Sequence, residues 1–122
     1  MVIMCFLSSK LPIKRVAEKD IKVKKVVTLD LHSIYQDFTW QPGTIYRTLL
    51  GDVYKQGQYY KVEKGFHSCK GFFYDRLRGN YYWNYVSIDS YSNRVVAAII
   101  PKGSEYYVDN GVYVSNQLII MV

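Results

Sequence analysis

The sequence is poor in the residues that build a disulfide framework or a metal centre. Its two cysteines, Cys5 and Cys69, lie far apart and form no CxxC motif. Two histidines add too few further candidates for a structural zinc site, which takes four Cys or His ligands. One separated cysteine pair also gives no pattern of a secreted disulfide scaffold. We therefore expect no metal, and we expect both cysteines to be reduced thiols in a cytoplasmic protein.

Long apolar runs are absent as well. No stretch approaches the roughly 20 apolar residues of a membrane-spanning helix, so the sequence predicts no integral membrane protein of that kind. The apolar opening over residues 2–7 has no basic residue before it and is too short for the core of a signal peptide. We interpret it as a first strand.

Catalytic and phosphate-binding motifs are missing too. Neither GxGxxG nor GxxxxGK[ST] occurs in the chain. His67 and Cys69 could approach each other on a strand, but no third group that would orient such a pair is evident. The acidic residues fall in turns or beside lysines. The sequence therefore predicts no catalytic residues and no cofactor.

The chain does contain enough apolar material for one core, and it has an excess of tyrosine. Its 122 residues and 49% hydrophobic content predict a single domain over 1–122. Thirteen tyrosines bring the aromatic fraction to 16%. A tyrosine packs a large ring and keeps one polar atom near water, which suits half-buried sheet faces and binding surfaces.

Positive charge is concentrated in the first two thirds of the chain. Residues 1–79 carry a net +7, whereas residues 80–122 carry a net −1. A basic face of this kind attracts nucleic acid, nucleotides or an acidic protein patch. An ordinary solvated strand face would have the same composition, and the sequence leaves both interpretations open.

Several segments have the period of two that is typical of half-buried strands. Alternation over 21–31 predicts a long strand, with a bulge or bend where Lys25 falls on the apolar side. A second strand is predicted over 58–67. Residues 44–50 fit a short helix or a short strand equally well.

The run 95–100 is apolar on both faces, which predicts a central strand that is covered on both sides. Segments 81–88 and 94–100 are rich in residues that favour strands, and we expect them to pair as a hairpin. The residues expected in the core are Val95, Val96, Ile99 and Ile100.

The C-terminal part has the pattern of a second hairpin. Segments 105–108 and 112–114 flank Asn110-Gly111, which fits a type I′ turn. Residues 117–122 are expected to form the last strand.

One helix is predicted over 69–78. Phe73 and Leu77 stand four positions apart, Ser68 is a candidate N-cap, and Gly79 is a candidate stop. The predicted fold class is therefore α+β: a β-rich single domain of short, mostly antiparallel strands in one or two sheets, with one short helix at about 69–78.

Three segments together resemble a widespread group of short uncharacterised proteins from bacteria and their phages, whose members also open with a phrase like MCFL. The segments are Lys64–Cys69 (KGFHSC), Ile100–Tyr107 (IPKGSEYY) and Tyr113–Ile120 (YVSNQLII). The resemblance implies a small intracellular protein that a bacterium or its phage encodes. Its motifs carry no assigned chemistry.

A second, weaker resemblance is to ADP-ribosyltransferase folds. It rests on Gly65-Phe66-His67-Ser68 and on the strand-rich segment over 112–119. Gly111 and Val112 stand where that family has its catalytic glutamate, and without this carboxylate the transfer chemistry loses its main electrostatic support. The resemblance therefore implies a protein that binds a nucleotide rather than one that turns it over.

Lysines and aromatic residues together predict a binding site for an anion. Lys22 and Lys24 project from one strand face and Lys61 from the outer face of another, so neighbouring strands would bring their ammonium groups together. A tyrosine beside them could stack on a base. The predicted ligand-binding residues are Lys22, Lys24, Tyr59, Lys61, His67 and Tyr82.

The prediction for function is a small non-enzymatic binding protein, a phage-encoded accessory or counter-defence factor in the host cytoplasm. It would capture a host protein or a nucleotide-like anionic ligand, with no membrane partner and with homo-oligomerisation left open. One alternative is an enzyme of the ADP-ribosyltransferase type that uses His32 or His67 with Tyr54 or Glu105. The other is a nucleic-acid-binding module with stacking aromatic residues over 81–85.

Overall fold

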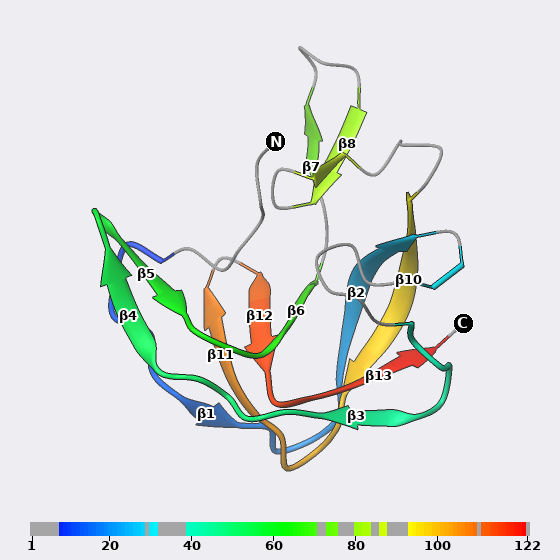
Figure 1. Ribbon diagram of the computed structural model, residues 1–122, viewed down its shortest axis with the longest axis horizontal. Helices are drawn as coiled ribbons and strands as arrows, with labels where there is room; N and C mark the ends of the chain where they lie inside the picture. The colour runs from blue at the N-terminus through cyan, green and yellow to red at the C-terminus, as the bar shows by residue number, and fades with distance from the viewer. Residues whose placement is uncertain are drawn as a thin grey trace.

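The computed structural model shows an all-β fold, and no helix occurs in the part of the chain that it describes. The strands form antiparallel sheets of eight, two and three strands (Figure 1). The described residues are 8–28, 30–31, 39–70, 73–75, 80–83, 86–87, 93–109 and 111–121.

The eight-stranded sheet contains most of the core. Its strands follow the order β1-β11-β12-β6-β2-β10-β13-β3. In that order their bounds are Arg15–Val16, Glu105–Asp109, Val112–Ser115, Phe66–Cys69, Ile21–Thr28, Asn93–Ile100, Gln117–Met121 and Ile45–Arg47. The sheet is strongly curved, and β13 and β3 run across the direction of β2 and β10 (Figure 1).

Two smaller sheets accompany it. β4 pairs with β5, and β8 pairs with both β7 and β9. The bounds of these strands are Val53–Gln56 for β4, Tyr59–Val62 for β5, Phe73–Asp75 for β7, Asn80–Trp83 for β8 and Val86–Ser87 for β9.

The central strands β2 and β10 pair along their whole length. The register runs without interruption from Ile21 opposite Ile100 to Thr28 opposite Asn93. The prediction of a bulge near Lys25 is therefore wrong, because the pairing of β2 with β10 contains none. The break in the apolar pattern marks an inward-facing lysine, because directly opposed residues share a face and Lys25 lies opposite the buried Val96.

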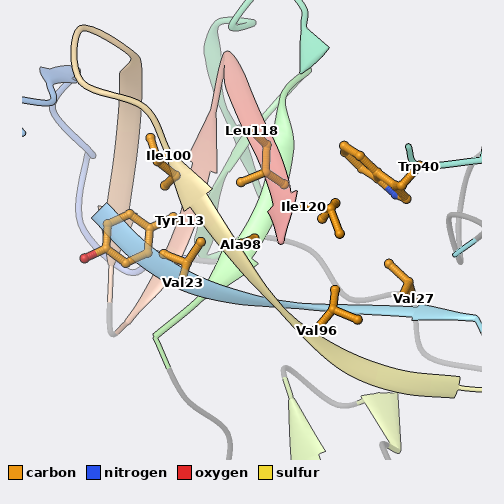
Figure 2. Close-up of a cluster of buried hydrophobic side chains, with 9 residues drawn as sticks. All are labelled: Val23, Val27, Trp40, Val96, Ala98, Ile100, Tyr113, Leu118 and Ile120. Carbon is orange, nitrogen blue, oxygen red and sulfur yellow. The ribbon is translucent and has the colours of Figure 1, made fainter. Parts of the chain in front are cut away.

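The main core lies on the concave face of the curved sheet (Figure 2). It draws on alternate residues of β2, β10 and β13, since successive strand residues point to opposite faces. Ile100, Leu118 and Ile120 are fully buried there. The complete cluster is Val23, Val27, Trp40, Val96, Ala98, Ile100, Tyr113, Leu118 and Ile120.

A smaller core lies on the opposite face, over β11 and β12. Tyr107 and Val114 are directly opposed on these two strands, and Val62 of β5 packs against them. Leu50 and Val53 complete the cover. The β4–β5 hairpin thus buries one part of the outer face of the large sheet.

The helix predicted over 69–78 is wrong. Cys69 ends β6, and Phe73–Asp75 form β7, which pairs with β8. Residues 71–72 and 76–79 lie outside the described residues. The aromatic residues of this segment favour strands, and Gly71 disfavours a helix, so these preferences outweigh a single pair of apolar residues at helical spacing.

The hairpin predicted between 81–88 and 94–100 is also wrong. β8 and β9 pair with each other inside the first segment, and β10 pairs with β2 and β13 instead. The eight residues of β10 find a partner of equal length in β2, whereas β8 and β9 are short.

The central position of β10 is confirmed, but its expected cover on both faces is not. Val96 and Ile100 are buried as predicted. Val95 and Ile99 are only half-buried, and Ala97 is exposed to solvent. Ala98 joins the core in their place. One face of this apolar strand is therefore partly open.

The C-terminal hairpin is confirmed. Asp109 lies opposite Val112, so two residues connect β11 to β12, and Gly111 has a φ of 78°, which a type I′ turn requires at its second position. Asn110 lies outside the described residues. The predicted last strand is present as β13.

The remaining strand predictions are refined by the structure. The ambiguous segment 44–50 contains the strand β3. The strand predicted over 58–67 is divided, because β5 ends at Val62 and β6 begins at Phe66. Gly65 lies between them with a φ of 153°, and a Cβ there would overlap the Val114 side chain.

We predict that Ile100→Ala lowers the free energy of unfolding by about 2–5 kcal/mol, because it removes a fully buried side chain and leaves a cavity. Ile99→Ala, one residue away on the half-buried face, should cost clearly less. Chemical denaturation of both variants measures the difference. Equal losses would show that the two faces of β10 are equally buried.

Candidate binding groove

A groove about 430 Å³ in volume lies on the outer face of the large sheet, over β2, β10 and β13. The uncovered face of β10 supplies its floor. The lining residues are Lys22, Val23, Lys24, Lys70, Ala97, Ala98, Ile99 and Met121.

Strand register explains why this face is hollow. Ala97 lies directly opposite Lys24 on β2 and directly opposite Met121 on β13. A short side chain thus stands between two long ones, and a recess forms over it. Next to this row, Ile99 lies opposite Lys22 and Ile119 and continues the apolar floor.

The charge of the groove has one sign. Lys22 and Lys24 are exposed on β2, and the exposed Lys70 follows the end of β6. β6 is the neighbour of β2, with Cys69 opposite Lys24, which places Lys70 on the same side of the groove. Among the described residues that line the groove none is acidic.

The structure places two of the three predicted lysines on one face and the third elsewhere. Lys22 and Lys24 share the outer face of β2, as predicted, and both line the groove. Lys61 and Tyr59 belong to β5, which pairs with β4 and is no neighbour of β2 in the large sheet. The condition under which Lys61 would converge with the other two lysines, that their strands are neighbours, is therefore not met.

The other two predicted site residues lie elsewhere. Tyr82 is part of β8, opposite Phe73 and Ser87, and its side chain lies outside the described part of the structure. His67 lies on β6 and lines a separate pocket. Lys70, which was not among the predicted site residues, lines the groove because it directly follows β6, the neighbour of β2.

The second pocket is small, about 180 Å³. The half-buried His67 borders it. The pKa of His67 is lowered to about 4, mainly by burial and also by the positive charge of Lys25, while a hydrogen bond with the Gly65 backbone opposes the shift. The imidazole is therefore neutral at pH 7. The lining residues are Thr48, Glu63, Lys64, Gly65, Phe66 and His67.

The alternative catalytic pairs join His67 or His32 to Tyr54 or Glu105, and the described residues bear on those that involve the pocket of His67. Its described lining contains neither Tyr54 nor Glu105. The Glu105 backbone N–H donates a hydrogen bond of 2.9 Å to the Asn116 side chain, at the start of the β11–β12 hairpin. His32 lies outside the described residues.

Lys25 lies beneath the groove, on the concave side of β2. Its Nζ donates a 2.6 Å hydrogen bond to the His67 carbonyl oxygen and lies 5.6 Å from the centroid of the Trp40 ring. Burial lowers its pKa to about 8, and the nearby Cys69 opposes that shift. The same strand therefore presents lysines to both of its faces, two to water and one to the interior.

Two further expectations concern cysteine and metal. Cys69 is a buried thiol, as predicted, and Cys5 lies outside the described residues. Within the part of the chain that the structure describes, no three His, Cys, Asp or Glu side chains gather in a way that could hold a metal ion. No helix in that part is long and apolar enough to cross a membrane.

Comparisons of the chain with protein-family models, with curated proteins and with solved structures gave no match.

We predict that the pKa of Lys25 makes stability rise with pH. The unfolded chain, with a pKa of 10.5 at this lysine, binds more protons than the fold between pH 8 and 10.5, so unfolding becomes less favourable across that window. The gain is about 3 kcal/mol. In Lys25→Met this gain should be missing from denaturation curves recorded between pH 7 and 10.5.

Other groups, tyrosines above all, titrate in the same range, so the quantity to compare is the difference between the two proteins at each pH. A difference that does not change with pH would show that Lys25 titrates normally in the fold.

The neutral His67 predicts a separate loss of stability in acid. The unfolded chain takes up a proton near pH 6.5, whereas the fold resists protonation until about pH 4, so stability falls as the pH falls between these values. His67→Gln should reduce that fall, as measured by thermal unfolding between pH 7 and 4. If the loss of stability in acid is the same in His67→Gln, the imidazole is in contact with water in the fold.

Proposed function

We propose that the protein is a non-enzymatic binding protein that captures a small anionic ligand in the groove over β2, β10 and β13. The observation that supports this most directly is the placement of Lys22, Lys24 and Lys70 on one side of an apolar recess. The proposal keeps two of the lysines selected from the sequence and replaces the aromatic contacts with the aliphatic residues of β10 and β13.

The physical case rests on shape and charge together. The groove has a volume within the range of about 300–1,000 Å³ that is typical of small-molecule sites. Three ammonium groups with no acid among the described lining residues attract an anion and raise its rate of association. The apolar floor adds contact area that an ordinary solvated lysine face lacks.

The resemblance to short phage proteins extends the proposal to a biological setting. On that basis the protein would act as an accessory or counter-defence factor in the host cytoplasm by sequestering its ligand.

The test is a charge reversal with a matched control. Lys22→Glu with Lys24→Glu reverses two charges in the groove, whereas Lys14→Glu with Lys19→Glu makes the same change at two exposed lysines outside it. The probes are AMP, ADP, cyclic AMP, glucose 6-phosphate, decyl phosphate and decanoate, with decanol as a neutral counterpart. Binding is measured by isothermal titration calorimetry and by thermal stabilisation.

At least one anion should bind, with an affinity that falls as salt rises. The groove variant should bind it at least about tenfold more weakly, and the control variant should change it much less, since only the groove loses direct attraction. Equal losses of affinity in both variants would show that the groove lysines act only through the net charge of the protein. If no probe binds the native protein, the groove is not a site for small anions.

A further inference from the structure

The groove is basic on one side and aliphatic on the other. All three lysines lie on the side of β2 and β6, and the opposite side, formed by β10 and β13, is aliphatic. Ala97, Ile99 and Met121 make up this aliphatic side. A ligand that satisfies both sides has its negative charge at one end and an apolar body at the other.

The apolar surface continues beyond the groove. Ile119 of β13 lies opposite Ile99, and Ile45 of β3 lies opposite Ile119 in turn. Ile45 is 40% exposed, and Ile99 and Ile119 are half-buried, so this row of side chains is partly open to water. From Lys22 the row Ile99, Ile119 and Ile45 therefore forms a narrow apolar track across three neighbouring strands.

The lining also speaks against a nucleobase. Among the described residues that line the groove none is aromatic, so no ring is placed to stack on a base. Tyr59, which the sequence suggested for that role, lies on β5 in a different sheet. Alkyl side chains instead favour a flexible aliphatic chain, whose methylene groups gain free energy by leaving water.

From this arrangement we infer that the ligand class is an anionic amphiphile, an aliphatic chain with a carboxylate or phosphate head. The head lies at Lys22, Lys24 and Lys70, and the chain lies over Ala97 and Ile99 toward Met121 and β3. This inference rests on the proposed function, because it assigns a chemical class to the same groove.

The occupant is a free monomer rather than a lipid still in its bilayer. Ala97 lies between the longer side chains of Lys24 and Met121, and a recess of this kind has room for one chain. Contact with a bilayer needs apolar side chains that project outward. The most exposed apolar residues, Leu49 and Ile13, are not part of the groove.

The decisive measurement is a chain-length series: butyl, hexyl, octyl and decyl phosphate, each below its micelle concentration, with AMP as an anion that has no alkyl chain. A fully buried methylene would tighten binding about fourfold, and a chain that stays partly in water about twofold. We expect affinity to rise about twofold per methylene, and AMP to bind more weakly than octyl phosphate.

Two single variants separate the two ends of the site. Met121→Gln replaces an apolar wall by a polar side chain of similar length and should flatten the chain-length series. Leu49→Gln makes a comparable change at a residue that is 78% exposed and outside the groove, and should leave the series unchanged. Lys24→Gln should weaken every phosphate in the series by a similar factor and preserve its slope.

The outcomes distinguish this inference from the function on which it rests. If AMP and butyl phosphate bind as tightly as decyl phosphate, the groove is a site for anions in general, and the inference of an amphiphilic ligand is wrong. A chain-length slope that Met121→Gln leaves intact places the chain elsewhere on the protein. Binding to phosphatidylglycerol vesicles but not to monomers would assign the groove to a membrane surface. No binding by any of these probes would overturn both.

Discussion

The continuous antiparallel pairing of β2 with β10 is the constraint on which the rest of the structure depends. Eight residues of each strand oppose each other without a bulge, so every residue of β10 is assigned to one face by its partner on β2. Val96, Ala98 and Ile100 enter the core, while Ala97 and Ile99 turn to the outer face opposite Lys24 and Lys22. A shift of one residue would bury those two lysines and expose the core side chains. The groove is thus a consequence of the same register that builds the interior.

The two faces of β2 also divide its lysines by environment. The outward lysines, Lys22 and Lys24, are exposed and lie beside the apolar floor of the groove. Lys25 faces the interior, where its Nζ contacts the His67 carbonyl oxygen and the Trp40 ring. Burial holds the pKa of Lys25 near 8, and this positive charge helps to lower the pKa of His67. The charge of Lys25 on β2 therefore affects the protonation of His67 on the neighbouring strand β6.

Much of the strand pattern could be read from the sequence, because alternation and turn residues are local signals. The Asn110-Gly111 turn predicted the β11–β12 hairpin, and alternation placed Lys22 and Lys24 on one outward face. Long-range pairing could not be read in this way. β10 takes a partner some seventy residues earlier in the chain rather than the neighbouring segment 81–88, and Lys70 reaches the groove only because β6 pairs with β2. The open face of β10 was missed since a run apolar on both sides looks the same whether or not another layer covers it.

Chemical-shift mapping tests the central claim most directly, because it locates the ligand without altering the protein. Titration of decyl phosphate into isotope-labelled protein should shift the backbone amide signals of Lys22, Lys24, Lys70, Ala97, Ile99 and Met121 together, with one shared dissociation constant. Signals around the small pocket, such as Thr48 and Glu63, should stay in place. Shifts that centre on that pocket, or that spread evenly over lysines throughout the chain, would contradict the assignment of the groove as the binding site.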